Sequence, residues 1–310
     1  MTEIQISDDQ LTSLKDKVIF ITGTYIHITS HSHIHPTKKP PHNPNSTGGA
    51  SGIGKATATL CLTHGAHTII GDINLPLLNP PSLNRNAQPQ RNPINAFTQI
   101  LTHYGRIDHV FANAGIGPTT SFLEETLDSS GNLTPPDFST LNVNLLGVLS
   151  TVRLAAYYIQ KYSTHRSENE LGSIVVTGSA SSFQDFSAGD YTVAKHGVLG
   201  IIRGLGGKME GKVRINAVAP SWTDTGMVPR EFIEGLGVGV QSPSVVARSV
   251  GLLFCDGGRH GEVLYSAEGR FREINKGAGG LLEAAKVAIG VVPEEGVMRR
   301  ISEAKGRGEI

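Results

Sequence analysis

The segment Thr47-Gly48-Gly49-Ala50-Ser51-Gly52-Ile53-Gly54 decides the fold of this chain. Its glycines are spaced as G-x-x-x-G-x-G, and a helical pattern over Lys55–His64 follows directly, with Gly65 as its predicted cap. Glycine lets the main chain approach a pyrophosphate closely, and a helix amino terminus supplies unpaired N–H groups. The segment therefore predicts a dinucleotide-binding turn, and a tight turn without a ligand is the alternative.

Apolar runs of strand length alternate with helical patterns on both sides of this turn. Buried parallel strands read as such near-continuous apolar runs. The alternation predicts an α/β fold with a parallel, doubly wound sheet and helices on both faces. The predicted strands are Lys17–Gly23, His67–Asp72, Ile107–Ala112, Ser173–Thr177, Val213–Val218 and Glu262–Tyr265, and the further predicted helices are Ile94–Tyr104, Thr140–Ser163, Tyr191–Gly204 and Pro243–Phe254.

The chain is expected to form one domain, because its 310 residues can bury a single core and contain no internal repeat. The first strand falls within 14–23, an atypical insertion within 24–47, the rest of the domain within 48–290 and a carboxy-terminal tail within 291–310. Leu75–Pro93 is rich in Pro, Asn and Gln and offers no good strand. We therefore expect the third strand to be missing or damaged.

Composition excludes several classes of function. Lys plus Arg and Asp plus Glu both number 27, so the formal net charge is zero, which leaves no electrostatic footprint for nucleic acid or an anionic membrane. Met1–Asp16 is polar and acidic and contains no apolar core of the kind expected in a signal peptide, and no apolar run approaches the roughly 18 residues that span a bilayer. Cys61 and Cys255 are too few for a disulfide framework. A cytoplasmic protein is expected.

Residues 24–46 interrupt the pattern with five histidines and four prolines. His31, His33 and His35 alternate, which suits a metal site on a strand, but no acidic or cysteine partner supports one and no metal is predicted. The dipeptide Thr-Gly stands at both ends of the segment, at 22–23 and 47–48, and removing one copy with the residues between restores a direct path into the glycine turn. We interpret the segment as a translated intron or another gene-model error, with a genuine surface insertion as the alternative.

Tyr191-Thr192-Val193-Ala194-Lys195 places a phenol and an ammonium on one face of a predicted helix. A free tyrosine has a pKa of about 10, too high for an efficient general base near neutral pH. A neighbouring lysine and an oxidised nicotinamide both favour the phenolate, so Tyr191 can take the proton of an alcohol while hydride leaves the same carbon. Ser179 precedes it in a position to hold the substrate oxygen, with Ser181 and Ser182 as weaker candidates. Each feature alone is typical of an exposed helix face or a turn.

Asp72 closes the strand after the glycine turn, near the offset of about 20 residues expected for a carboxylate that binds the adenosine ribose. A carboxylate there accepts hydrogen bonds from a free 2′-hydroxyl and repels a 2′-phosphate. Asp72 therefore favours NAD over NADP as the cofactor. A strand-end aspartate that caps the next segment is the alternative.

Several motifs follow one another along the chain, in the order Gly48/Gly52/Gly54, Asp72, Asn113-Ala114-Gly115, Asn144-Leu145-Leu146-Gly147, Ser179, Tyr191/Lys195 and Pro220-Ser221-Trp222-Thr223-Asp224-Thr225. This is the order found in the short-chain dehydrogenase/reductases, and the chain resembles the single-domain members of that family, with a carboxy-terminal stretch similar to fungal members. The resemblance implies a Rossmann-type fold. Ser221 stands where the family usually has glycine, which is a mild departure.

The resemblance implies a role for each matched residue. Tyr191 would be the acid/base, Lys195 would lower its pKa and bind the nicotinamide ribose, Ser179 would position the substrate oxygen, and Asn144 would hold a water in a proton relay. Without their ordered neighbours, Asn113 and Asn144 would be interpreted as making ordinary backbone hydrogen bonds. The implied cofactor-binding residues are Gly48, Ser51, Gly52, Ile53, Gly54, Asp72, Asn113, Gly115, Tyr191, Lys195, Thr223 and Thr225.

The implied activity is NAD(P)-dependent interconversion of a small secondary alcohol and a ketone, in secondary metabolism, by a homodimer or homotetramer. The glycine-rich segment Gly226–Gln241 is expected to set the substrate and to move as a lid. The alternative is a catalytically impaired relative that binds cofactor or a partner without turnover. The insertion and the missing third strand favour this alternative, whereas the complete catalytic set favours the enzyme.

Overall fold

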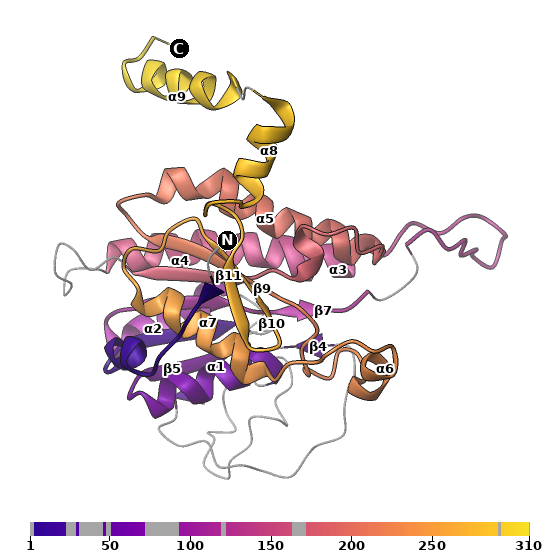
Figure 1. Cartoon of the computed structure of the whole chain (residues 1–310), viewed down its shortest axis with the longest axis horizontal. Helices are drawn as coiled ribbons and strands as arrows, with labels where there is room; N and C mark the ends of the chain where they lie inside the picture. Colours follow the sequence, from indigo (N-terminus) through magenta and orange to yellow (C-terminus); the bar gives the residue numbers. More distant parts are fainter. Residues whose placement is uncertain are drawn as a thin grey trace.

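The structure is a computed structural model that describes residues 3–22, 29–30, 46–47, 51–71, 93–118, 122–162, 172–290 and 293–309. Within these residues a nine-stranded sheet forms the centre of the molecule (Figure 1). Neighbouring strands from β10 to β5 are parallel, which confirms the predicted sheet. The strand order is β1 (Glu3–Ile4), β11 (Arg270–Glu273), β10 (Val263–Ala267), β9 (Arg214–Pro220), β8 (Ser173–Thr177), β6 (His109–Ala112), β2 (Val18–Thr22), β5 (His67–Gly71) and β3 (Thr29–Ser30).

Helices cover both faces of the sheet because side chains of a strand alternate between its two faces. Phe20 of β2 packs on one side with Phe97, their rings edge to face at 5.3 Å, in a core that α2 (Pro93–Tyr104), α4 (Val148–Lys161) and α5 (Gly189–Met209) complete. Its neighbour Ile19 packs on the other side with Phe254, under α1 (Gly52–Thr63), α7 (Pro243–Cys255) and the 3-10 helix η1 (Asp9–Leu14). The chain is thus a three-layered α/β unit, as predicted.

The six predicted strands are present with bounds that shift by at most two residues among the described positions. The helix predicted over Thr140–Ser163 is present, but it is not α-helical throughout, because a π-helix at Asn142–Gly147 joins α3 (Ser139–Leu141) to α4. Such a turn inserts an extra residue into a helix and frequently occurs at functional sites. Elements without a clear period were not predicted: β1, β11, η4 (Ala180–Ser182), α6 (Arg230–Gly235), α8 (Leu281–Ile289), α9 (Pro293–Gly306) and the small sheet of β4 (Ser46–Thr47) with β7 (Gly115–Ile116).

The edge of the sheet next to β5 departs from a regular doubly wound fold. The described residues contain no third parallel strand there, and residues 72–92 lie outside the described ranges. Instead β3, which comes from the insertion, pairs antiparallel with Ile69 and Ile70. An edge strand offers unpaired N–H and C=O groups to any segment that reaches it. Part of the insertion therefore follows strand geometry, although its sequence shows no strand period.

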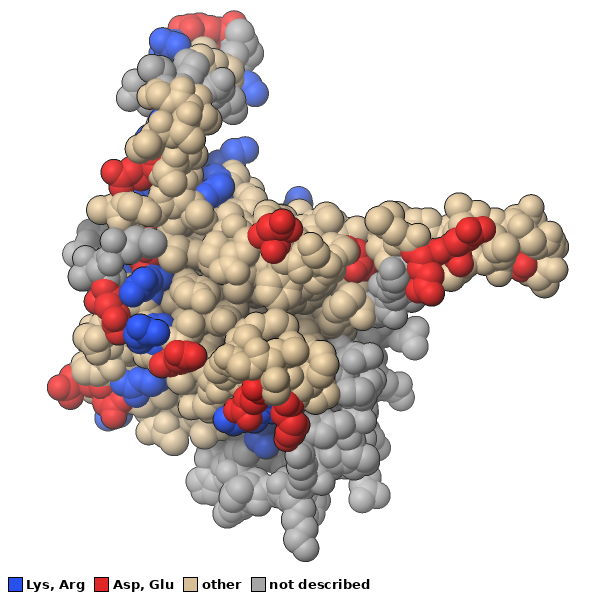
Figure 2. All heavy atoms as spheres, turned by 45° about the vertical axis from the view of Figure 1, so that its right-hand side comes forward, with Lys and Arg blue, Asp and Glu red and all other residues tan. Residues whose placement is uncertain are grey.

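Two parts of the chain extend away from the body of the molecule (Figure 1). Residues 122–138 form an arm whose carboxylates, among them Glu124, Glu125 and Asp128, give the projection its acidic surface in Figure 2. At the carboxyl end, α8 buries none of its residues. Both projections leave the central sheet and its helices as the frame of the site.

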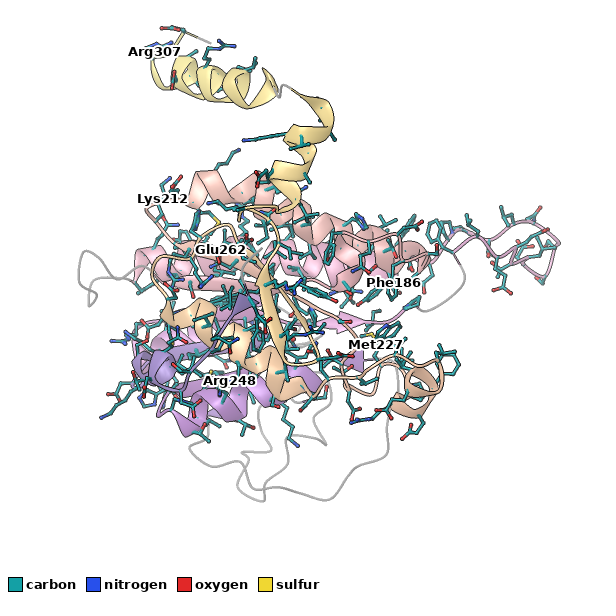
Figure 3. The ribbon with its side chains drawn as sticks, in the orientation of Figure 1. Phe186, Lys212, Met227, Arg248, Glu262 and Arg307 are labelled. Carbon is teal, nitrogen blue, oxygen red and sulfur yellow. The ribbon has the colours of Figure 1, made fainter. Side chains whose placement is uncertain are left out.

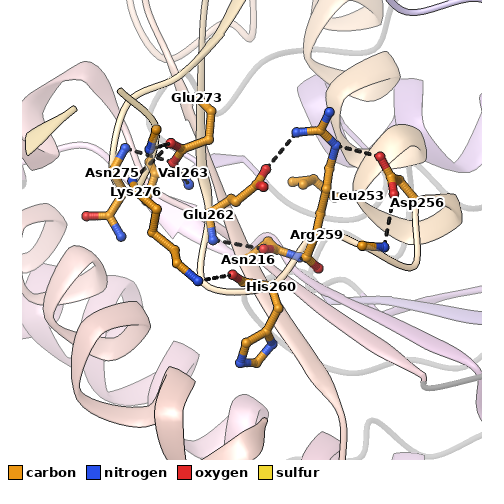
Figure 4. Close-up of polar contacts among 12 residues, drawn as sticks. Asn216, Leu253, Asp256, Arg259, His260, Glu262, Val263, Glu273, Asn275 and Lys276 are labelled. Carbon is orange, nitrogen blue, oxygen red and sulfur yellow. Dashed lines mark hydrogen bonds and ion pairs between the residues drawn. The ribbon is translucent and has the colours of Figure 1, made fainter. Parts of the chain in front are cut away.

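Polar side chains fasten the amino ends of β9 and β10 to the loop that follows α7 (Figure 4). Asn216 of β9 donates to Arg259 O at 2.9 Å and accepts from Glu262 N at 2.9 Å. Arg259 in turn bridges Asp256 at 2.9 Å and Glu262 at 2.7 Å. Glu273 accepts from four backbone N–H groups, those of Val263, Asn275, Lys276 and Gly277. Hydrogen bonds and ion pairs therefore hold the amino ends of β9 and β10 in place, and the cavity lies at the opposite end of the sheet.

Candidate active site

The carboxyl ends of β6, β8 and β9 open onto a cavity of about 430 Å³. Doubly wound sheets bind their ligands at this edge. Asn113 follows β6, Ser179 lies just beyond β8, and Tyr191 and Lys195 reach the same cavity from α5. Figure 3 shows two more lining residues, Phe186 and Met227, on the side of the molecule that carries α6. The topology therefore brings together residues that are far apart in the sequence.

Ser179 and Tyr191 both line the cavity, and their hydroxyls lie close enough to interact. Burial raises the pKa of Tyr191, and the Ser179 hydroxyl partly opposes that rise. Ser179 is held in extended backbone geometry because its Oγ caps η4, accepting from Ser181 N at 3.1 Å. The neighbouring hydroxyls serve the backbone and Thr192 instead: Ser182 Oγ accepts from Ser179 N, and Ser181 Oγ donates to Thr192 Oγ1. Of the three serines, only Ser179 lines the cavity.

Lys195 is almost fully buried beside Tyr191. Its Nζ donates to Thr177 O at 2.8 Å and lies 5.6 Å from the centroid of the Tyr191 ring. Burial lowers the pKa of Lys195 to about 8. Thr177 also donates from Oγ1 to Asn113 Oδ1 at 3.1 Å, so the end of β8 connects the lysine with the asparagine after β6. Two further N–H bonds of the ammonium remain for a ligand.

Asn144 lies in the π-helix and is fully buried, but it does not line the cavity. Its Oδ1 accepts from Ile116 N at 2.9 Å and its Nδ2 donates to Ile116 O at 2.8 Å. The side chain therefore pins β7 through both backbone groups of one residue, which is the backbone bonding that the sequence left as an alternative. Its own carbonyl belongs to the π-helix, where the i to i−4 pattern is interrupted.

The glycine turn lies against the segment that follows β9. Gly52 has a φ of +47°, and a Cβ added to it would lie 3.0 Å from Thr225 Cβ. Ser51 precedes α1 in extended geometry and gives no side-chain cap to its first turn. Ile53 lines the cavity and Gly54 is buried in the helix. Gly48 and Asp72, two further predicted cofactor residues, lie outside the described ranges.

Thr223, Thr225 and Gly115 also line the cavity. Thr223 Oγ1 donates to Ser221 O at 2.8 Å and accepts from Gln241 Nε2 at 3.2 Å. The sequence reasoning missed Gln241, which is 4% exposed, because a single glutamine in a glycine-rich segment carries no signal. It likewise missed Phe186, which precedes α5 in a loop without periodicity.

Much of the cavity lining is apolar, although Gln184 and Arg230 also line it. Phe186 and Trp222 face each other with ring centroids 5.5 Å apart. Met227 reaches across from the segment after β9, close enough that a Cβ on Gly117 would lie 3.5 Å from its Cγ. The apolar residues that complete these walls are Pro118, Val228, Ile233 and Val240. Such walls bind apolar surface and leave specificity to a few polar groups.

The described residues fit the pyrophosphate and nicotinamide half of a dinucleotide. The first turn of α1 has no side-chain cap, so its N–H groups suit an anion, and the close backbone at Gly52 leaves no room for a side chain. Lys195 offers two N–H bonds for ribose hydroxyls, and Thr223 offers a hydroxyl. Among the described residues no group of three or more His, Cys, Asp or Glu is placed to hold a metal ion, and His31, His33 and His35 lie outside them.

Comparison with known proteins gives consistent matches. Residues 46–234 match the model of the short chain dehydrogenase family. The chain is 36% identical over 318 residues to the short-chain dehydrogenase/reductase ascJ of Acremonium egyptiacum, covering 99% of this chain and 97% of that protein. It is 34% identical to the short-chain dehydrogenase/reductase ATR7 of Stachybotrys chlorohalonatus, over 67% of each chain. It is also 30% identical to (+)-borneol dehydrogenase 1 of Salvia officinalis, over 58% of this chain and 69% of that one.

Solved structures share the fold at low sequence identity. An aldohexose dehydrogenase of Thermoplasma acidophilum in ligand-free form superposes with a TM-score of 0.55 at 20% identity, covering 82% of this chain and 93% of that one. The structure of gox2181 superposes with a TM-score of 0.57 at 20% identity, covering 83% and 96%. In the part of the chain that the structure describes, none of the helices has the length and apolar character needed to cross a membrane.

Proposed function

Because this chain belongs to the short-chain dehydrogenase/reductase family, we propose that its cavity binds NAD(P) and a secondary alcohol or its ketone, which it interconverts. The observation that carries the proposal is the convergence of Ser179, Tyr191 and Lys195 on one cavity beside the glycine turn. A phenol, a hydroxyl and a buried ammonium at one oxygen-binding point supply what proton transfer at a carbonyl requires.

In the oxidative direction, Ser179 holds the substrate oxygen against Tyr191 by a hydrogen bond. The Tyr191 oxygen, as phenolate, accepts the proton of the alcohol as the C–H bond breaks and the C=O bond forms. The nicotinamide, when bound, supplies the acceptor for the hydride. In the reductive direction Tyr191 returns its proton to the carbonyl oxygen. Lys195 favours the phenolate by its charge and orients the ribose through its free N–H bonds.

Asn144 is proposed to contribute through its backbone. With both ends of its side chain bound to Ile116, only main-chain groups of the π-helix remain to hold a water. A water there would connect Lys195 with bulk solvent and carry the proton away from Tyr191. Its side chain acts by fixing the π-helix relative to β7.

NAD is proposed over NADP because Asp72 directly follows β5 in the sequence. A carboxylate at that point accepts from the 2′-hydroxyl of the adenosine ribose and repels a 2′-phosphate. Replacing Asp72 with Ser should improve the use of NADP relative to NAD in initial-rate assays. A wild-type protein that already prefers NADP would contradict this assignment.

The substrate is proposed to be a largely apolar alcohol with a ring system, of the kind met in secondary metabolism. The support is the apolar surface that Phe186, Trp222 and Met227 contribute to the cavity lining, where Gln184 and Arg230 are polar side chains outside the Ser179–Tyr191 pair. The relative named as a borneol dehydrogenase is named for such an alcohol. A panel of apolar cyclic and polar acyclic alcohols tests the proposal, which fails if the polar acyclic ones turn over faster.

A homo-oligomer is proposed from the family and from the outer face of α5. Gly200, Gly204 and Gly207 are exposed there, and a Cβ on each would meet nothing within 4 Å. Glycine inside a helix destabilises it by about 1 kcal/mol relative to alanine. Contacts within the chain do not explain why three glycines are present here, whereas the close approach of a second copy of the chain does. Gly204→Leu should lower the mass measured by light scattering.

A cytoplasmic location is proposed because Cys61 and Cys255 are free thiols.

The second candidate is a relative that binds cofactor without turnover, which the insertion before the glycine turn favours. One experiment separates the two. Quenching of NADH fluorescence by the purified protein reports binding, and a ketone and alcohol screen reports turnover. Binding with turnover supports the enzyme, binding alone supports the second candidate, and the absence of both overturns the proposal.

A further inference from the structure

Gln241 lies where the loop over the cavity returns to the body of the protein. Its backbone pairs with both neighbours of Thr223: Gln241 N donates to Trp222 O at 3.0 Å, and Asp224 N donates to Gln241 O at 3.0 Å. The next residue, Ser242, is the N-cap of α7, which packs on α1. The strand-like contact therefore fastens the Thr223 segment to a rigid helix.

Only the nitrogen of the Gln241 side-chain amide makes hydrogen bonds with the described residues. Nε2 donates to Ser266 O at 3.0 Å, to Ser266 Oγ at 3.2 Å and to Thr223 Oγ1 at 3.2 Å. Oε1 is buried and has no hydrogen-bond partner among the described residues. Turning the amide over would set Oε1 against the Ser266 carbonyl, so the donor orientation is fixed. A buried acceptor left unpaired calls for an explanation other than stability.

These contacts determine what the Thr223 hydroxyl can offer a ligand. The hydroxyl has one donor and two lone pairs. Its proton goes to Ser221 O at 2.8 Å, and one lone pair accepts from Gln241. Because Thr223 lines the cavity, one lone pair remains, and the hydroxyl can only accept a hydrogen bond there.

We propose that Gln241 is a positioning residue that holds the Thr223 hydroxyl as an acceptor for the N–H of the nicotinamide carboxamide. The inference rests on the proposed function, since it presumes that a dinucleotide occupies the cavity. The carboxamide has a donor end and an acceptor end, so an acceptor-only hydroxyl selects one rotamer of it. Dinucleotides that lack the amide N–H lose this contact.

Binding of three ligands, measured by titration calorimetry, tests the proposal. NAD⁺ carries the amide, 3-acetylpyridine adenine dinucleotide replaces it with an acetyl group, and ADP-ribose lacks the ring. If the protein prefers the 2′-phosphorylated forms, their counterparts are used. The wild-type protein should bind NAD⁺ about 3- to 10-fold more tightly than the acetylpyridine analogue, as expected for one hydrogen bond. In Gln241→Leu that ratio should fall towards one, while affinity for ADP-ribose stays unchanged.

A double-mutant cycle shows whether Gln241 acts through Thr223. Thr223→Val removes the acceptor, so the ratio should be near one in this variant and no lower when Gln241→Leu is added. Gln160→Leu, a matched exchange on the exposed face of α4, should leave the wild-type ratio. If Gln241→Leu does not fold, Gln241→Met removes the amide donor with an unbranched, adaptable side chain and should give the same result.

Equal losses of NAD⁺ and ADP-ribose affinity in the Gln241 variants would overturn the inference, because they indicate a merely structural role. An unchanged ratio would overturn it as well. Both results leave the proposed function intact. A wild-type protein that binds neither NAD⁺ nor ADP-ribose, nor their 2′-phosphorylated forms, would overturn the proposed function and this inference together.

Discussion

At the cavity, two ionisable side chains lie in surroundings that disfavour their charged forms. Burial raises the pKa of Tyr191 and lowers that of Lys195 to about 8. The sequence predicts the pair and its spacing on one helix face, and it names only the influences that favour the phenolate. It does not predict the desolvation, since that depends on Thr177 and on elements far away in the chain. The charge of Lys195 beside the Tyr191 ring and that of a bound cofactor must therefore offset the effect of burial on the Tyr191 pKa before the phenolate forms.

Tyr191→Phe should reduce turnover by about 10²- to 10⁴-fold, because it removes the transferable proton and little else. Cofactor affinity should stay within a few-fold of wild type, as measured by quenching of NADH fluorescence. Tyr158→Phe, on α4 and outside the cavity, is the matched control and should retain activity. Near-normal turnover in Tyr191→Phe would remove this residue from the mechanism.

Lys195 should make the stability of the cofactor-free protein depend on pH. Its folded pKa of about 8 lies below the ordinary value of 10.5, so between these values the unfolded chain binds more protons than the folded one. The free energy of unfolding contributed by this group therefore rises with pH in that window and is lowest below it. Thermal unfolding should show wild type gaining stability relative to Lys195→Met between pH of about 8 and about 9.5.

The comparison stops at about pH 9.5 because the raised pKa of Tyr191 acts in the opposite sense near pH 10 and above. Lys208→Met, an exposed lysine on the same helix, serves as the control and should run parallel to wild type. Parallel curves for Lys195→Met and wild type would mean that the ammonium is better solvated than its burial indicates.

At the scale of elements, the site depends on how the first turn of α1 meets the segment after β9. Periodicity predicts α1 and β9, the glycine spacing predicts the turn, and the family resemblance singles out the segment after β9, so most of the frame follows from the sequence. The contact between Gly52 and Thr225 does not, because nothing in either motif specifies the other. The π-helix around Asn144 and the loop contacts of Gln241 were also unpredictable, since both arise from packing between elements and leave no period.

Gly52→Ala should weaken cofactor binding as well as stability. A residue with a side chain at φ +47° costs about 1–2 kcal/mol, and the new Cβ would lie 3.0 Å from Thr225 Cβ and displace that segment from the cavity. Gly105→Ala is the matched control, because its φ is +70° and a Cβ there meets nothing within 4 Å. Both variants should lose stability in thermal unfolding, and only Gly52→Ala should lose NADH affinity. Equal affinities would show that the contact has no part in binding.

At the scale of the whole molecule, the insertion divides the turn from its strand. β2 stands in the middle of the sheet between β5 and β6, and α1 packs beside it, although residues 23–50 separate them in sequence with only two short strands described in between. The match to the family model begins at residue 46, within the last two residues of the insertion. β2 and α1 thus pack against each other although the insertion separates them in the sequence.

Deleting Thr24–Gly48 should raise thermal stability and NAD affinity without loss of fold. The deletion joins Gly23 of the first strand to Gly49 of the turn and restores Val-Ile-Phe-Ile-Thr-Gly-Gly-Ala-Ser-Gly-Ile-Gly, so the path from strand to helix becomes short and fixed, as phosphate binding requires. Closing a long loop disfavours folding only slightly, by about 0.6 kcal/mol per doubling of length, so the gain in stability should be modest and the gain in affinity larger.

The loss of β3 from the edge of the sheet is the effect of this deletion that most strongly opposes a gain in stability. Removing β3 takes away its two-residue pairing with Ile69 and Ile70 and exposes the free edge of β5. Thermal unfolding and calorimetric NAD titration of the deletion variant, with a Thr29→Pro variant that blocks the pairing but keeps the insertion, separate the two effects. If the deletion lowers stability and Thr29→Pro lowers it equally, β3 is a structural part of the sheet. If the deletion protein instead loses stoichiometric Zn²⁺ bound by wild type through His31, His33 and His35, the insertion is a metal-binding element and its interpretation as foreign to the fold is wrong.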